Sequence, residues 1–419
     1  MHDGLTDRRR QLAFIAAVLV LAMSLWFSTS AVVPALRAHW GITNQQAGWL
    51  TAAVQLGFVI GALLSAGCNL PDVVKQPRLM AVAAALGALM TAALAGWSHG
   101  LASAIPLRFG TGFALAGVYP VGMRVMASWF DKGRGLALGV LVGALTLGSA
   151  LPQLVNGVTT LPWRGVLFAA SGLALLGALV AEKMVRTGPH LAAAPPFAPG
   201  YVIRMFRDRR QRLVNFGYLG HMWELYALWT WLPAYVAASF TEAGMHSHRR
   251  LVVGAIMFAA IGLAGAAGCL IAGRLADRHG RAEITIIAMA LSGLCCVLAA
   301  PAFGLGPVGL VPLLLVWGAA VIADSAQFSA ALTEVADPRY VGTALTAQTA
   351  LGFLLTILTI QTLPVLVDAI GWRGAMPLLA LGPLAGIAAM ARLRRDRAGR
   401  LMVDWTRPPD PTYEGAEAP

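Results

Sequence analysis

Five ionisable side chains stand inside long apolar stretches of the sequence. They are Arg108, Arg124, His221, Glu224 and Asp324. If those stretches cross a membrane, a charge near the centre costs at least ~2.5–3.5 kcal/mol, so it normally faces a cavity or a partner. Carboxylates and imidazoles can carry protons, whereas a planar guanidinium can hold an anion by two parallel hydrogen bonds. We therefore expect proton transfer, anion binding, or both from this set.

The three proton-carrying side chains have helical spacing. His221 and Glu224 are three residues apart and share a helix face, and Asp324 has Gln327 three residues after it. The pattern predicts a proton-coupling site formed by His221, Glu224 and Asp324. The alternative is structural: a hydrogen-bonded pair that fixes one helix to its neighbour, or a buried pair of Asp324 with an arginine.

The composition identifies the kind of chain that holds these residues. Of 419 residues, 58% are hydrophobic and only 12% are charged, whereas a soluble domain carries about 25% charged residues. This excludes a water-soluble enzyme and a disordered chain, and it leaves an all-α polytopic membrane protein. Helices satisfy their backbone in lipid and need ~20 apolar residues to cross it. The twelve predicted spans are 12–36, 46–67, 79–98, 102–128, 135–160, 164–184, 212–240, 251–273, 283–303, 307–333, 341–366 and 373–391.

The distribution of positive charge predicts the orientation. The net charge of +12 comes from 31 Lys and Arg against 19 Asp and Glu. With a cytoplasmic N-terminus, most of these cations fall in cytoplasmic segments, as membrane insertion favours. We expect both termini in the cytoplasm and no nucleic-acid partner. The scarcity of Lys beside Arg, with abundant Ala, is typical of a bacterial inner-membrane protein.

The two halves of the chain repeat in the same order. The triplet WRG opens spans six and twelve at 163–165 and 372–374, and GLAL at 135–138 corresponds to GTAL at 342–345. The repeat predicts two pseudo-symmetric six-helix bundles. The predicted divisions are an N-terminal bundle (1–184), a cytoplasmic linker (185–211), a C-terminal bundle (212–392) and a disordered cytoplasmic tail (393–419).

Three motifs resemble the major facilitator superfamily. Residues 273–281 read GRLADRHGR, which closely resembles the family's loop signature and stands between spans eight and nine, where that signature belongs. The equivalent loop 68–75 keeps Asp72 but loses the Gly-Arg ending. Residues 108–116 resemble the span-four motif, and 129–135 resemble a loop of the anion-transporting branches, such as nitrate and organic-anion symporters. The resemblance implies a gating role for Asp72, Gly273, Asp277, Arg278, Gly280 and Arg281.

The same resemblance implies which spans line a central cavity: one, four, seven and eleven. For each aromatic residue on them, packing against lipid or a neighbouring helix is the alternative to ligand contact. Arg124 either binds an anion or extends to the water interface. The predicted cavity residues are Trp26, Arg108, Tyr119, Arg124, Tyr226, Trp229, Gln327 and Gln348.

The sequence therefore predicts a secondary active transporter for a small polar and potentially anionic solute. It would work by alternating access with proton coupling, as a monomer in the lipid bilayer. A proton-driven efflux antiporter for drugs or metabolites is the alternative. An integral-membrane enzyme would need a catalytic constellation, and a sensor would usually carry a sizeable soluble domain; the sequence has neither. We therefore expect no enzymatic activity. The four cysteines lack metal-ligand spacing, so we also expect no metal and no cofactor.

Overall fold

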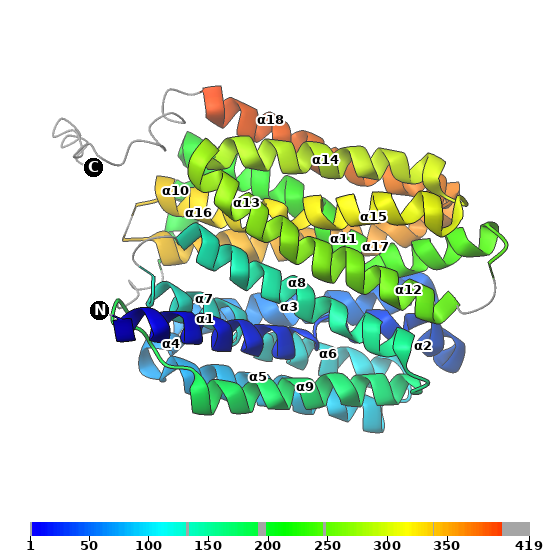
Figure 1. Ribbon diagram of the computed structural model, residues 1–419, viewed down its shortest axis with the longest axis horizontal. Helices are drawn as coiled ribbons and strands as arrows, with labels where there is room; N and C mark the ends of the chain where they lie inside the picture. Colours follow the sequence, from blue (N-terminus) through cyan, green and yellow to red (C-terminus); the bar gives the residue numbers. More distant parts are fainter. Residues whose placement is uncertain (1, 131–133, 192–197, 246–248, 338, 396–419) are drawn as a thin grey trace.

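The computed structural model describes residues 2–130, 134–191, 198–245, 249–337 and 339–395, and within these ranges every regular element is a helix. The long helices run side by side along one axis (Figure 1). Most of the predicted tail lies outside the described residues, as do residues 131–133 of the segment before span five.

The first half of the chain folds into ten helices, shown in blue to green in Figure 1. They are α1 (His2–Met23), η1 (Ser30–Val32), α2 (Val33–Trp40), α3 (Asn44–Gly67), α4 (Leu70–Val73), α5 (Gln76–Trp97), α6 (Leu101–Leu115), α7 (Tyr119–Ala127), α8 (Arg134–Val158) and α9 (Trp163–Met184). Local sequence sets some of the boundaries. Thr43 and Gln46 form a capping box that begins α3, and Gly41 ends α2 in the left-handed conformation with φ of 65°.

The second half begins with the linker helix α10 (Tyr201–Arg207). The bundle helices are α11 (Arg209–Glu242), α12 (Arg249–Met257), the π-helix η2 (Phe258–Ala264), α13 (Gly265–His279), α14 (Arg281–Ala302), α15 (Gly306–Ala323), α16 (Ser325–Val335), α17 (Val341–Ala375), η3 (Met376–Ala380) and α18 (Leu381–Arg395). Gly371, with φ of 68°, divides α17 into two helices.

Each predicted span coincides with one helix or with consecutive helices of the structure. Nine helical segments among the described residues are long and apolar enough to cross a membrane, and the last of them, Val341–Arg395, covers two predicted spans. Helices α1 and α11 account for the remaining predicted spans, one and seven. The prediction of an all-helical membrane protein is therefore confirmed.

Three predicted spans are interrupted near their middle. Residues 24–29 form turns after α1, residues 116–118 separate α6 from α7, and Asp324 separates α15 from α16. The second and third interruptions fall at equivalent positions of the two halves, where Gly117 corresponds to Asp324. Each interruption frees backbone groups inside the protein, and these groups need partners.

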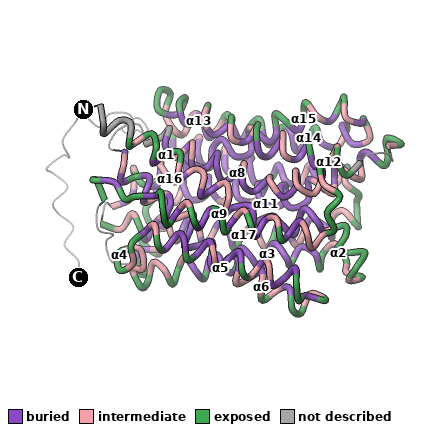
Figure 2. The backbone as a smooth tube through the Cα atoms, turned by 60° about the horizontal axis from the view of Figure 1, so that its bottom comes forward, coloured by how far each residue is buried: buried purple, intermediate pink, exposed green. Residues whose placement is uncertain are grey.

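Close helix contacts hold the N-terminal helices together. A Cβ atom at Gly57 of α3 would collide with the Phe109 carbonyl group of α6, and one at Gly112 of α6 would collide with Val54. Backbones can approach this closely only without side chains, as is common between membrane helices. The buried residues concentrate in the interior of the helix bundle, and the exposed ones lie mainly at its two ends and along the outer helices (Figure 2).

Candidate functional site

A buried acid–base pair joins α11 to the interruption between α15 and α16. His221 Nδ1 lies 2.9 Å from Asp324 Oδ1, and each side chain is 2% exposed. The rings of Phe328 and Tyr218 lie next to the imidazole, with centroids 5.7 Å and 6.1 Å away. Among the described residues, the other ring nitrogen, His221 Nε2, has no hydrogen-bond partner. The pair can hold one proton and still has a nitrogen free for a ligand.

Glu224 lies one helical turn further along α11 but binds different neighbours. Its Oε1 accepts hydrogen bonds from Ser292 Oγ at 2.5 Å, Trp317 Nε1 at 2.6 Å and Cys296 Sγ at 3.2 Å. These donors come from α14 and α15, so Glu224 connects three helices of the C-terminal bundle. The sequence grouped His221, Glu224 and Asp324 together; the structure pairs the first with the third and surrounds Glu224 with donors of its own.

Six aromatic rings meet at the centre of the molecule, and we call them the aromatic cluster. They are Trp26, Phe27, Phe58, Tyr226, Trp229 and Phe353. Trp26 lies 5.0 Å from Phe58 in its own half, and 6.0 Å from Tyr226 in the other half, between ring centroids. The cluster therefore spans the boundary between the two halves.

The predicted cavity residues include Trp26, Tyr226 and Trp229 of this cluster but not its three phenylalanines. Phe58 and Phe353 pack against each other with centroids 4.9 Å apart. A phenylalanine inside an apolar helix carries no signal that separates it from lipid-facing residues. The predicted Tyr119 lies outside the cluster, at the start of α7, where it is half-buried.

Several polar atoms on the elements that carry the cluster are buried without partners among the described residues. They are Trp26 Nε1, Trp229 Nε1, Thr29 Oγ1, Gln55 Nε2, and both amide atoms of Gln348. Buried polar groups in proteins are nearly always hydrogen-bonded, so a concentration of unpaired ones points to a polar ligand or to water. Most of these atoms can donate a hydrogen bond, which suits carboxylate or hydroxyl oxygens.

Arg108 is fully buried, and all three of its guanidinium nitrogens have protein acceptors. Nε donates to the Leu50 carbonyl at 3.0 Å, Nη1 to the Leu25 carbonyl at 3.0 Å, and Nη2 to the Trp26 carbonyl. Ser28 Oγ adds a longer contact of 3.4 Å. Arg108 thereby gives the Trp26 carbonyl, in the turns after α1, a donor, while the Leu25 carbonyl also accepts from Ser28 Oγ at 2.9 Å. Its predicted role in anion binding stays a prediction.

Three of the predicted gating residues, Asp72, Asp277 and Arg281, form ion pairs at the end of the molecule that carries α4 and α16 (Figure 1). In the first half Arg124 pairs with Asp72. In the second half Arg281 contacts Glu334 at 2.6 Å, Gln327 at 2.7 Å and Asp277 at 3.5 Å.

These ion pairs involve residues that the sequence assigned to other roles. Arg124 and Gln327, predicted to line the cavity, bind the gating residues Asp72 and Arg281, and their role in a cavity stays a prediction. Gly273 is buried in α13, Arg278 is exposed, and Gly280 follows α13 with φ of 90°.

Polar contacts join the two halves at the opposite end. Arg250 donates to Asn156 Oδ1 at 2.7 Å and to the Leu161 carbonyl at 2.8 Å. Closer to the centre, Thr356 Oγ1 donates to Gln55 Oε1 at 2.5 Å. We call these contacts the outer gate. Across the described part of the chain, no group of three or more His, Cys, Asp and Glu side chains could hold a metal ion.

Known proteins with similar sequences are transporters. The chain is 26% identical over 305 residues to a probable L-galactonate transporter of Escherichia coli K12, covering 66% of this chain and 64% of that protein. It is 24% identical to a gallate transporter of Pseudomonas putida, over 69% of each chain. A probable sulfoacetate transporter of Cupriavidus necator is 26% identical, over 66% of this chain and 67% of that protein. The match therefore spans just under two thirds of the galactonate relative.

Solved structures show the same fold. A crystal structure of a mutant of the nucleoside transporter NupG superposes with a TM-score of 0.72 at 13% sequence identity, covering 91% of this chain and 99% of that one. The sequence profile of the Major Facilitator Superfamily matches residues 14–360. Because that profile covers most of the chain and the fold agrees, this chain belongs to the Major Facilitator Superfamily.

Proposed function

We propose that this chain is a secondary active transporter that moves a small organic anion together with protons. It would lie in the bacterial inner membrane with both termini in the cytoplasm, and its two bundles would alternate in access around the aromatic cluster. The three relatives are named for galactonate, gallate and sulfoacetate, which are all organic acids ionised at neutral pH. This shared chemistry supports an anionic substrate.

The His221–Asp324 pair is the observation that carries the coupling proposal. Both side chains are 2% exposed, so a change of one proton there changes the charge of a nearly dry site. Charges buried in apolar surroundings need a partner, because their desolvation is costly. The other titratable groups that face the pair are Tyr218 on α11, Glu224 one turn further on, and Cys269 on α13. None of these is a cation that could replace a protonated His221.

Proton and substrate would meet at the imidazole. When the imidazole of His221 is protonated on both nitrogens, Nε2 can donate a hydrogen bond to a carboxylate while Nδ1 stays beside Asp324. The amide of Gln348 and the indole N–H groups of Trp26 and Trp229 would supply further donors. An anion would then bind best to the protonated carrier, which is the requirement for symport.

Transport by Asp324→Asn in proteoliposomes tests the proposal. A thermal-shift screen of organic acids, including galactonate, gallate and sulfoacetate, would first identify a ligand, because a ligand that binds the folded state raises its stability. The substitution keeps the shape of the side chain but removes the charge that moves with the proton. We expect the variant to exchange substrate across the membrane at equal concentrations but to lose accumulation driven by a pH gradient.

Glu224→Gln is the matched control, since it makes the same chemical change on a carboxylate with three protein donors. Glu224→Gln should lower the stability of the protein and should reduce exchange and pH-driven accumulation together. Normal pH-driven accumulation by Asp324→Asn would contradict coupling through this pair. Loss of exchange as well would indicate a structural role. A ligand screen that returned only cations would contradict the anionic substrate.

A further inference from the structure

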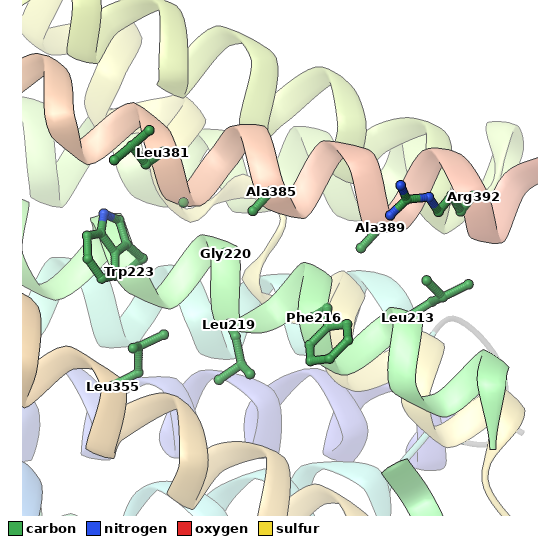
Figure 3. A pocket seen from close by; sticks show the side chains of 11 residues that line it. Leu213, Phe216, Leu219, Gly220, Trp223, Leu355, Leu381, Ala385, Ala389 and Arg392 are labelled. Atoms are coloured by element: carbon green, nitrogen blue, oxygen red, sulfur yellow. The ribbon is translucent and has the colours of Figure 1, made fainter. Parts of the chain in front are cut away.

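A groove runs along the surface of the C-terminal bundle between α11, α17 and α18 (Figure 3). Its volume is about 380 Å³, which falls within the range of ligand-binding pockets in proteins. Its walls consist mainly of apolar side chains. Two of them are open to the surroundings of the protein: Phe216 is 46% exposed and Leu381 is 56% exposed. The groove is separate from the aromatic cluster and from the His221–Asp324 pair.

Small residues create the groove. A Cβ atom at Gly220 of α11 would lie 2.5 Å from the Gly382 carbonyl oxygen of α18, so the two backbones touch at the bottom. Further along α18, Ala385 and Ala389 line the groove with single methyl groups. Larger side chains at these positions would fill the space, so the depth of the groove is fixed by rigid helix packing.

The length of the groove matches one leaflet of a bilayer. Along α18 it extends from Leu381 to Arg392, which is about 16 Å at the rise of an α-helix. The hydrocarbon core of a bilayer is about 30 Å thick, so this is half of it. Arg392 lies near the end of α18, on the side predicted to face the cytoplasm, and Leu381 lies near the middle of span twelve. An acyl chain of an inner-leaflet lipid would fit along this path.

The one charged residue that lines the groove stands at its mouth. Arg392 is exposed and, among the described residues, forms no ion pair, whereas the neighbouring Arg394 pairs with Glu283. Figure 3 shows Arg392 beside Ala389, at the end of the groove that Leu213 also lines. A cation at the cytoplasmic interface attracts anionic headgroups.

We propose that this groove is a binding site for one anionic phospholipid of the cytoplasmic leaflet. Its phosphate would pair with Arg392, and one acyl chain would lie between α11 and α18. Gly220 and Trp223 line the groove directly beside His221 and Glu224 in the sequence, so the bound lipid would support the segment of α11 that carries both.

Native mass spectrometry of the purified full-length protein tests the site. The protein is exchanged from neutral detergent with phosphatidylglycerol or phosphatidylcholine of identical acyl chains, and the retained lipid is counted. We expect one retained phosphatidylglycerol, preferred over phosphatidylcholine by about five-fold, as one basic residue near the surface provides. Arg392→Gln should abolish the preference, and Ala385→Phe should abolish retention of that lipid by filling the groove.

Two control variants separate the site from general effects. Arg395→Gln removes a cation from the same exposed end of α18, and Leu384→Phe enlarges an exposed side chain of α18 that does not line the groove. Both should retain the lipid as the unmodified protein does. Equal retention of the two lipids, or equal losses in controls and test variants, would overturn the proposal. So would a dimer that Ala385→Phe dissociates, since the groove would then hold a second copy.

Discussion

At the scale of single residues, the buried charges divide into those that hold the fold and those that can change. Arg108 forms no ion pair with a carboxylate in the described part of the chain; its hydrogen bonds end on carbonyl groups of Leu25, Trp26 and Leu50. Glu224 is similarly enclosed by donors of the protein. The His221–Asp324 pair differs, because its contact leaves atoms of both side chains without hydrogen bonds among the described residues.

Arg108→Lys should destabilise the protein although it preserves the charge. One ammonium group cannot reach all three carbonyl groups, and a buried carbonyl left unpaired, such as that of Trp26, costs roughly 1–3 kcal/mol. We expect a lower midpoint of thermal unfolding in detergent. Arg37→Lys, at an exposed position on α2, should leave the midpoint unchanged. An unchanged midpoint in Arg108→Lys, combined with lost ligand affinity, would instead indicate direct anion binding.

Part of this residue-scale description follows from the sequence, because a charge in an apolar span is conspicuous. Its partner is not, since pairing depends on which helices become neighbours. Asp324 could therefore be selected without the knowledge that its partner is His221 and not an arginine. Ser292 and Trp317, which hold Glu224, resemble any other residues of an apolar helix.

At the scale of the helices, glycine positions determine how closely neighbours pack. Gly57 of α3 and Gly172 of α9 both lie inside long helices, but only Gly57 faces another backbone. The spans were predictable because hydropathy and the length of a bilayer crossing fix them together. The departures from regular α-helix were not: residues 24–29 and the π-helix Phe258–Ala264 lie in apolar sequence that could continue as a regular helix.

Gly57→Ala should destabilise the N-terminal bundle, while the same substitution at Gly172 should not. The new methyl group on α3 would collide with the Phe109 backbone, and such overpacking typically costs about 1–3 kcal/mol. At Gly172 nothing lies within 4 Å of the new atom, and alanine is a better helix former by roughly 0.5–1 kcal/mol. Thermal unfolding of both variants gives the comparison. Equal midpoints would contradict the close contact between α3 and α6.

At the scale of the whole molecule, the outer gate holds the two halves together at one end. Its contacts join α8 to α12 and α3 to α17. Arg250 connects the halves, whereas Arg373 binds Glu242 and the Phe303 carbonyl within the C-terminal bundle. The two arginines therefore provide a matched comparison between contacts across the boundary and contacts inside one bundle.

Arg250→Ala should shift the population towards a conformation with this end open. Losing hydrogen bonds worth about 1 kcal/mol changes a two-state ratio about five-fold. Spin labels at Ala38 and Ala243, both exposed near this end, would report longer distances by double electron–electron resonance. The measurement requires Cys68→Ser, because Cys68 is exposed and the other three cysteines are buried. Arg373→Ala should leave the distances unchanged; a similar shift in both variants would argue against the outer gate.

The paired interruptions at Gly117 and Asp324 have a consequence for how such a molecule can evolve. A duplicated ancestral unit would have passed the same backbone bend to both halves, but only one copy carries an acidic side chain at the bend. The bend belongs to the architecture, and the acid is a local specialisation added to it. Descendants of one ancestor could therefore gain, lose or move an acidic side chain through single substitutions at a position the backbone already accommodates. Proteins that share this fold can then be expected to differ in what they transport, because the backbone can be conserved while the side chains at the bend change.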